Sequence, residues 1–312
     1  MISKLRFLIY FLLIFLNFNN IFSFENKILI KIDNDIITTI DVFNESNYLL
    51  ALNQDLKNLD KNSIYEITKN SLIKDKIKSK ELRKNFESLQ VEEKILNEII
   101  VSIYKNKKFD NYNSFIDHLN EFDVSIEYIK NKISIELLWN DLIAKKFSKN
   151  VLIDKDKIKN DLQKDLNKNS KDYLLSEIIF DVEDSKSYEK KVELIESDIA
   201  QKGFLNAVLI HSISNSASNS NGDIGWVNEN SLNLRIKKVI ADLKVGSHTK
   251  PIKIPGGFLI LKINDIRTAE NQMIDLDIKV NEVINLERNN QLNNYSNIYF
   301  NKVKKELKIY ES

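Results

Sequence analysis

Apolar residues recur every three or four positions along much of the first half of the chain, which is the spacing of one face of an α-helix. The clearest stripes are Val91, Ile95, Ile99 and Ile103; Tyr112, Phe115, Leu119 and Phe122; and Ile126, Ile129, Ile133 and Leu137. A less regular helix is predicted over residues 64–82. Because one stripe buries only one face, we expect these helices to pack on each other. We interpret the stripes as core, and no ionisable residue among them suggests a site.

A short alternating segment precedes these helices. Residues 27–32 alternate polar and apolar side chains, residues 33–35 are turn formers, and Ile36 and Ile37 resume the apolar pattern, which predicts a small β-hairpin. Thr38 is followed three residues later by Asp41, a capping-box spacing. The pattern therefore predicts a helix from this point to about residue 52.

Residues 1–23 have the plan of a secretory signal peptide. Lys4 and Arg6 precede an unbroken apolar run over residues 7–16, and a more polar stretch ends at Ser23. The apolar run is about half of the roughly 20 residues that span a bilayer. We expect cleavage after Ser23. Retention of the segment as an anchor, extended through Phe18, Ile21 and Phe22, is the alternative.

The second half of the chain contains the residues that break helices. All six glycines and both prolines lie between Gly203 and Gly257, so the backbone must turn often there. Strands are predicted over residues 174–182 and 258–266, and helices over 185–202 and 229–243. The polar stretch 166–172 is the predicted domain boundary. After Thr268 the chain alternates weakly and then enters a polar helix, roughly residues 286–307.

Composition narrows the possible functions. The net charge is only +1, so nothing indicates nucleic acid or an anionic membrane as a partner. Cysteine is absent, which excludes disulfides and thiolate catalysis, and with only three histidines we expect no metal site and no cofactor. Export together with the absence of cysteine suggests a bacterial periplasm.

The glycine-rich stretch carries a specific resemblance. The run from Asn221 to Val227 (Asn-Gly-Asp-Ile-Gly-Trp-Val) is followed by Gly246 and then by the segment from Gly256 to Lys262 (Gly-Gly-Phe-Leu-Ile-Leu-Lys). This order and spacing resemble a parvulin-type peptidyl-prolyl isomerase domain, over roughly residues 173–268. The family has a glycine turn, a helix, a glycine-bounded turn and a closing strand.

The beginning and end of the chain are similar to SurA-type chaperones. In those proteins a short hairpin and a threonine-capped helix open the mature chain, and a C-terminal helix with a last short strand completes the helical domain. The resemblance implies an α+β fold: a helical chaperone domain over 24–166, an inserted parvulin-like α/β domain over 173–268, and a segment 269–312 that packs on the helical domain.

The resemblance to parvulins also assigns a candidate site. The family binds the proline ring in an apolar slot, with two histidines and a cysteine or aspartate nearby. Carried over, the first histidine falls at Glu177, the second at Phe258, and the cysteine or aspartate at Ser214. The apolar positions are retained as Leu232 and Ile236, with Asn233 between them. We expect a substrate-binding slot without the family's catalytic residues; a slot that is simply filled by its own side chains is the alternative.

Taken together, the resemblance implies a periplasmic, ATP-independent chaperone. Its expected partners are unfolded outer-membrane proteins and, at the point of release, the outer-membrane assembly machinery. The alternative is an active peptidyl-prolyl isomerase, soluble or anchored in the membrane, whose site tolerates these replacements.

Overall fold

The computed structural model describes residues 26–165, 170–182, 185–214, 222–232, 234–268 and 276–311. Its α-helices are α2 (Thr39–Leu52), α3 (Lys61–Arg83), α4 (Glu93–Asn106), α5 (Tyr112–Asn120), α6 (Ile126–Phe147), α7 (Lys155–Asp165), α8 (Ser185–Lys202), α9 (Phe204–His211), α11 (Leu234–Ile240) and α12 (Leu276–Glu306). Its strands are β1 (Ile28–Ile32), β2 (Asp35–Thr38), β3 (Lys171–Phe180), β4 (Asp223–Asn228), β5 (Ile252–Ile254), β6 (Gly257–Thr268) and β7 (Ile309–Glu311). Short 3₁₀ turns are η1 (Gln54–Asn58), η2 (Ser148–Asn150) and η3 (Glu229–Ser231). The fold is α+β, as predicted; the signal-peptide prediction lies outside the described residues.

The first strands and helix form as their sequence predicts. β1 and β2 pair in an antiparallel hairpin, and Asp33 takes a positive φ of 50° in the turn. The Thr38 backbone N–H donates to the Asp41 carboxylate at 2.7 Å, while the Asp41 N–H donates to Thr38 Oγ1 at 3.3 Å. This capping box satisfies N–H groups that have no partner within helix α2.

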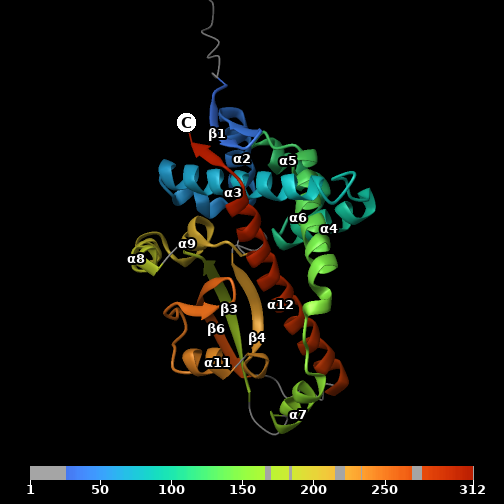
Figure 1. Ribbon diagram of the computed structural model, residues 1–312, viewed down its shortest axis with the longest axis vertical. Helices are drawn as coiled ribbons and strands as arrows, with labels where there is room; N and C mark the ends of the chain where they lie inside the picture. The colour runs from blue at the N-terminus through green and yellow to red at the C-terminus, as the bar shows by residue number, and fades with distance from the viewer. Residues whose placement is uncertain are drawn as a thin grey trace, which may run out of the picture.

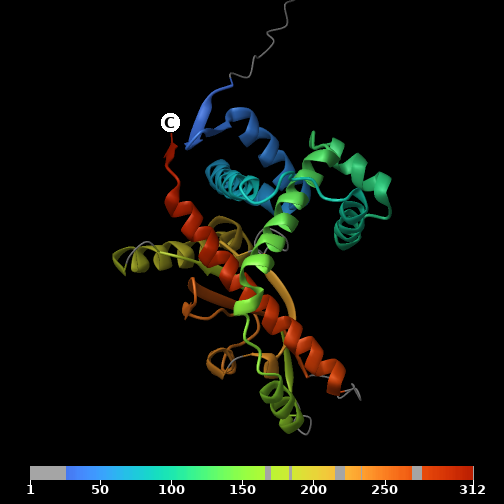
Figure 2. The ribbon, with the colours of Figure 1, turned by 45° about the vertical axis from the view of Figure 1, so that its right-hand side comes forward.

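The two ends of the described chain meet in one sheet. β7 pairs antiparallel with β1, giving the strand order β2-β1-β7, and Figure 1 shows the C-terminal arrow beside β1. Helix α12 leads to β7 and runs along the long axis of the molecule (Figure 2). We call residues 26–165 together with α12 and β7 the helical part, and residues 170–268 the parvulin-like part.

Helix α12 begins ten residues earlier than the sequence pattern predicted. The weakly alternating residues Leu276, Ile278 and Val280 are part of the helix, not of a strand. Val280 and Ile284, one turn apart, pack against Leu162 of α7, and this burial decides the conformation over the local alternation.

The other end of α12 closes the core of the helical part. Trp139 of α6 is fully buried, and its indole N–H donates to Ser296 Oγ of α12 at 2.8 Å. Its ring also lies 5.8 Å from the ring of Tyr299. A buried indole keeps its N–H bonded in this way, so α12 is fixed to α6 by both packing and a hydrogen bond.

The parvulin-like part is a four-stranded antiparallel sheet of order β4-β3-β6-β5. Helices α8 and α9 cover one face with a core that contains Ile178, Phe180 and Ile260, whereas η3 and α11 cover the other over Leu175, Ile179 and Leu261. The helix predicted over 229–243 is instead the turn η3 followed by the short α11. Asn and Ser, which are weak helix formers, interrupt this stretch.

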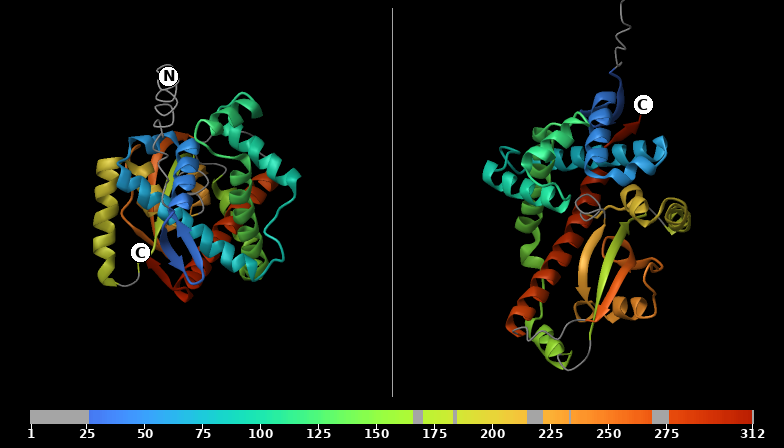
Figure 3. Two further views of the ribbon diagram at one scale, coloured as in Figure 1. Left: turned by 90° about the horizontal axis from the view of Figure 1, so that it is seen from above. Right: turned by 180° about the vertical axis from the view of Figure 1, so that it is seen from behind.

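The two parts contact each other along α3 and α12. The Lys74 ammonium of α3 donates to the Ser214 carbonyl after α9 at 3.4 Å. A Cβ on Gly256, in the β5–β6 turn, would lie 3.1 Å from Ile298 Cγ1 of α12. Figure 3 shows α12 lying between α6 and the four-stranded sheet.

Candidate functional site: the proline slot

The glycine turn before β4 holds the end of the slot in place. Gly222 has φ 81°, and a Cβ there would lie 2.7 Å from the Glu177 carbonyl oxygen and 2.8 Å from Val208. The Glu177 N–H donates to the Gly222 carbonyl at 2.8 Å. Only glycine allows both this conformation and this approach, so the turn fixes the backbone beside Glu177.

Three of the predicted residues share one face of the sheet. Leu232 and Ile236 pack against the core cluster that contains Leu175, Ile179 and Leu261. Glu177 lies between Leu175 and Ile179 on β3, and side chains two apart on a strand point to the same face. Glu177 is half-buried and pairs across the sheet with Leu261. The structure therefore brings Glu177, Leu232 and Ile236 to the same face.

Phe258 does not lie with them. Its ring stacks on Phe180 at 5.5 Å and lies tilted against Tyr188 of α8 at 4.6 Å, within the cluster on the opposite face. Its neighbour Leu259 is buried in the slot-side cluster. The assignment of the second histidine position to Phe258 is corrected accordingly: a shift of one residue on a strand moves a side chain to the other face. We define the proline slot as Glu177, Leu232, Ile236 and Leu259.

Ser214 is part of the packed backbone beside β3. It is 2% exposed, and its hydroxyl lies 2.9 Å from the hydroxyl of Ser212. The Ser212 oxygen in turn accepts a hydrogen bond from the Ile179 N–H at 3.0 Å. These contacts fix the loop to the strand. Asn233, the remaining predicted position, lies outside the described residues.

The histidines of the chain lie away from the slot. His118 is half-buried, with Nε2 2.9 Å from the Ala51 carbonyl oxygen, and His248 lies 3.5 Å from Glu196. His211 is buried, and its Nε2 lies 2.7 Å from Asp198 Oδ2. Burial, with Lys191 nearby, lowers the pKa of His211 from 6.5 to about 4, so the ring is neutral at pH 7.

The side chains of the slot pack against the core of the sheet, and few polar groups stand among them. Its described side chains are three aliphatic groups and one carboxylate, and no histidine lies among them. Over the described ranges, no cluster of three His, Cys, Asp or Glu side chains is arranged to hold a metal ion.

A buried ionic network inside the helical part was missed by the sequence reading. Glu45 is fully buried and forms an ion pair with Lys132, which also pairs with Asp75. Nearby, the Lys78 ammonium donates to both oxygens of Glu136 at 2.6 and 2.7 Å. These residues come from α2, α3 and α6. The available signal was the i, i+4 pair Lys132/Glu136, which a solvated helix face would show equally.

The network shifts the proton affinities of its members. Burial raises the pKa of the Asp75 carboxyl. Burial also disfavours the charged form of Lys132, but the carboxylates of Asp75 and Glu45 outweigh this and raise its pKa. Burial, reinforced by Lys78, lowers the pKa of Lys74 to about 8. The network binds three helices together and lies apart from the proline slot.

The fold and the slot together define a class. A glycine turn, an antiparallel sheet and an apolar slot between sheet and helix are the parts of a parvulin-type domain, and residues 173–265 match the family model for the PPIC-type PPIase (rotamase) domain.

The relatives extend the comparison beyond this domain. The chain is 21% identical over 169 residues to the chaperone SurA of Pseudomonas putida, and 25% identical over 166 residues to SurA of Pseudomonas fluorescens. These matches cover 52% and 50% of this chain and 40% and 39% of the relatives' length. The predicted resemblance to a SurA-type chaperone with a parvulin domain is confirmed.

Solved structures described as SurA-like chaperones or as PpiC-type domains also match this chain, at low overall similarity. A Campylobacter jejuni structure, described as that of SurA-like chaperones PEB4 and Cj1289, covers 92% of this chain and 99% of its own, with 18% identity and a TM-score of 0.37. An isolated PpiC-type domain covers 33% of this chain at 22% identity and a TM-score of 0.29. In the part of the chain that the structure describes, every helix is too short or too polar to cross a membrane.

Proposed function

We propose that this protein is a periplasmic, ATP-independent chaperone that binds unfolded outer-membrane proteins, and that its parvulin-like domain is degenerate in catalysis. The observation that carries the proposal is the composition of the proline slot, where three aliphatic side chains and Glu177 stand and no histidine is present. The slot keeps apolar side chains where the resemblance to parvulins places the proline ring, and it lacks the histidines that the family has there.

The chemistry of prolyl isomerisation explains why this slot is a poor catalyst. The barrier to rotation of the peptide bond is ~18–20 kcal/mol, and the enzyme must favour the twisted amide over the planar one. One positioned hydrogen-bonding or acid–base group is typically worth ~10²–10⁴ in rate. The slot has a half-buried carboxylate, Glu177, at the position of the first histidine, and Leu259 faces it from β6. Neither side chain can donate a hydrogen bond as the family's two histidines do.

The helical part offers apolar surface for a client. Ile40 and Phe43 on α2, Ile95 on α4 and Tyr112 on α5 are each between 42% and 48% exposed. Side chains of this kind bind extended apolar segments reversibly without a nucleotide cycle. The proposed periplasmic location rests on the signal-peptide pattern of residues 1–23 and on the resemblance to SurA chaperones, and the outer-membrane assembly machinery is the proposed recipient of the client.

An active isomerase is the second candidate function. It is favoured by the match of the PPIC-type family model to residues 173–265 and by the retention of Leu232 and Ile236 on the slot face. The two candidates differ in what the slot does, and separate assays distinguish them.

The test of the chaperone function is an aggregation assay. An outer-membrane β-barrel protein is diluted from urea, and light scattering is followed with and without the full chain. We expect suppression at stoichiometric amounts and weaker suppression by Ile95→Gln/Tyr112→Gln. The matched control is Leu194→Gln, because Leu194 is 51% exposed but lies on α8 of the parvulin-like part. Unchanged scattering at a molar excess of the wild-type chain would overturn the proposal.

A further inference from the structure

A groove lies between helix α12 and the end of the parvulin-like part that carries the β5–β6 turn. Its volume is about 940 Å³, and it is lined by the β5–β6 turn, the segment before α8 and one side of α12. Ile254 and Phe258 come from the sheet, Tyr188 from α8, and Ile298 from α12. The groove therefore uses both parts of the molecule, and the slot contributes no side chain to it.

The floor of the groove is apolar and aromatic. Phe258 is half-buried, with the Tyr188 ring 4.6 Å away. Ile298 stands opposite and is 44% exposed, although it contacts the β5–β6 turn at Gly256. An aromatic or aliphatic side chain placed between Phe258 and Ile298 would remove exposed apolar surface from water on both sides.

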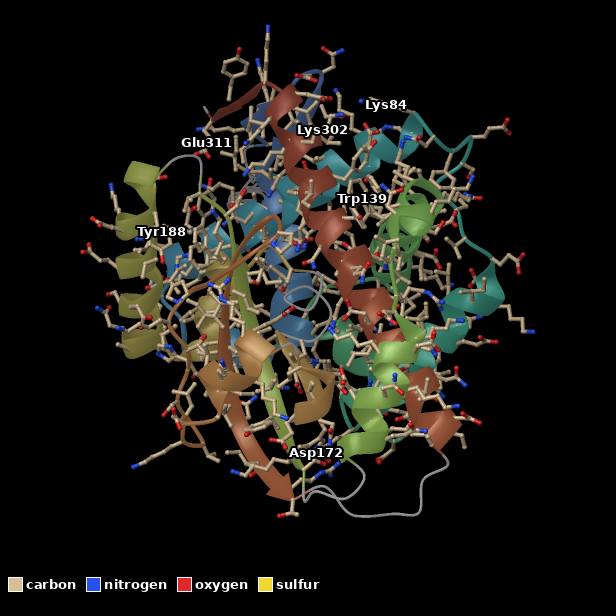
Figure 4. The ribbon with its side chains drawn as sticks, turned by 60° about the horizontal axis from the view of Figure 1, so that its bottom comes forward. Lys84, Trp139, Asp172, Tyr188, Lys302 and Glu311 are labelled. Atoms are coloured by element: carbon tan, nitrogen blue, oxygen red, sulfur yellow. The ribbon has the colours of Figure 1, made fainter. Side chains whose placement is uncertain are left out.

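The rim of the groove is basic. Lys253 of β5 and Lys302 and Lys305 of α12 line it and are exposed, and Asp181 is the one acidic side chain in the described lining. Within the described part of the chain, these three lysines form no ion pair with a carboxylate. Figure 4 shows Lys302 on α12 and Tyr188 across from it on α8. The rim is thus complementary to an anionic ligand.

The edge of the sheet favours an extended ligand. β5 is the last strand of the order β4-β3-β6-β5, so one side of it pairs with β6 and the other carries no strand of the described chain. The Lys253 carbonyl of this strand accepts a hydrogen bond from the Arg235 guanidinium at 3.2 Å, so an extended peptide beside the strand would be held mainly by side-chain contacts with the groove.

From the apolar floor, the basic rim and the position of the groove beside an edge strand, we propose that this groove binds an extended peptide segment in which an aromatic side chain lies next to a carboxylate. The aromatic group occupies the space between Phe258 and Ile298, and the carboxylate lies among Lys253, Lys302 and Lys305. The carboxylate is that of an acidic side chain of the segment, and the peptide whose only carboxylate is its C-terminus tests this assignment. The inference rests on the proposed function, because it names the kind of client segment that the chaperone selects.

The experiment is calorimetric titration of the full chain with short synthetic peptides. The probe is an N-acetylated, C-amidated hexapeptide in which Phe and Glu alternate, compared with the same peptide carrying Gln for Glu. A third peptide carries Gln for Glu but ends in Phe with a free carboxylate, which separates the two sources of charge. We expect the Gln amide to bind at least about tenfold more weakly than the best carboxylate peptide, a difference of ~1.4 kcal/mol, and the advantage to shrink in high salt.

Variants locate the binding to the groove. Lys302→Glu/Lys305→Glu is expected to weaken the carboxylate peptides about tenfold or more, and Ile298→Gln to weaken all three peptides. The control is Lys279→Glu, which makes the same type of charge change on α12 about 35 Å from Lys302, from a rise of ~1.5 Å per residue. Circular dichroism of each variant confirms that it is folded, since the substituted side chains are exposed or partly so.

The outcomes separate this inference from the chaperone proposal. Equal affinity for the Glu and Gln peptides, or equal affinity of Lys302→Glu/Lys305→Glu and wild type, would overturn the groove assignment even if the chain suppresses aggregation. Charge-dependent binding that these variants abolish supports the groove even if the aggregation assay fails.

Discussion

In the helical part, six charged side chains lie among packed helices, whereas in the parvulin-like part the slot where the family places its polar groups is lined mainly by aliphatic ones. The groups of the first region are Glu45, Lys74, Asp75, Lys78, Lys132 and Glu136. Ion pairs join Lys78 to Glu136, and Lys132 to both Glu45 and Asp75, while the Lys74 ammonium donates to the Ser214 carbonyl. The second region places Leu232, Ile236 and Leu259 around Glu177.

This contrast shows that a buried charged group can belong to a structural ion pair as well as to a catalytic site. Strongly shifted proton affinities often mark catalytic sites, yet here they belong to a network of three positive and three negative groups that binds α2, α3 and α6. A buried pair of this kind adds little stability compared with apolar side chains of the same volume, but removing one partner alone is strongly destabilising. The proposed binding functions use apolar surface and a basic rim, and neither of them requires a shifted group.

The largest expected effect comes from breaking the network. Lys78 is 1% exposed and bonds both oxygens of Glu136. Lys78→Met removes one partner and leaves Glu136 buried, which should lower the free energy of unfolding by ~3–5 kcal/mol. Urea unfolding followed by tryptophan fluorescence measures this free energy. All variants carry Trp226→Phe, so that the fluorescence comes from Trp139 in the helical part.

The matched control for this experiment removes both charges. Lys78→Met/Glu136→Leu leaves no unpaired carboxylate, so it should recover more than half of the loss. A single variant as stable as wild type would mean that the ion pair is dispensable and would remove the contrast between the two regions.

The next effect concerns the backbone of the parvulin-like part. Gly257 has φ 152°, and a Cβ there would lie 2.4 Å from the Phe180 carbonyl oxygen. Gly257→Ala should cost about 3 kcal/mol or more, because β6 must move away from β3. Gly203→Ala is the control: it also has a positive φ, 85°, but nothing lies within 4 Å of its Cβ, so about 1–2 kcal/mol is expected. Equal losses in thermal unfolding would contradict the close approach.

A smaller effect is the pH dependence of His211. Its pKa falls from 6.5 to about 4 in the folded chain, because burial and Lys191 disfavour the charged ring. The unfolded state therefore binds the proton more tightly than the folded state. The stability that the neutral His211 ring contributes is complete above pH 6.5 and is lost as the pH falls toward 4. The loss amounts to roughly 3 kcal/mol at most. His211→Gln should show a flatter stability curve between pH 6.5 and 4 in urea titrations; an identical slope would argue against the assigned shift.

The smallest expected effect is a partial recovery of catalysis. Glu177→His/Leu259→His places two histidines on the slot face and should accelerate prolyl isomerisation by about tenfold over wild type, below the ~10²–10⁴ of an optimised group. Glu177→His/Phe258→His is the control, because position 258 faces Tyr188 and Phe180 on the other side of the sheet. Activity in the control equal to that of the first variant would refute the assignment of faces.

The sequence predicted the elements well where burial is periodic. The stripes at Ile99 and Ile129 lie on α4 and α6, and the capping residues Thr38 and Asp41 begin α2 as expected. The buried face of α4 was predicted wrongly: Ile95 of the stripe is 42% exposed, whereas its neighbours Leu96 and Ile100 are buried. Local pattern failed at the start of α12, where packing of Val280 on α7 overrides a weak alternation.

The candidate site could be predicted only in part. The resemblance to parvulins assigned Glu177, Leu232 and Ile236, which the structure brings to one face, but it did not separate Phe258 from Leu259. Adjacent residues on a strand differ only in the face they present, and both are apolar. The ionic network could not be predicted either, since Glu45 and Lys132 are 87 residues apart and meet only through the packing of α2 and α6.

The most direct test of the central claim is the rate of cis–trans isomerisation of a short Xaa-Pro peptide, measured with increasing amounts of the wild-type chain in a preparation that suppresses client aggregation. The account predicts a rate indistinguishable from the uncatalysed one, because Glu177 and Leu259 supply no hydrogen-bonding pair for the twisted amide. A rate that rises with protein concentration to that of active parvulins would contradict it.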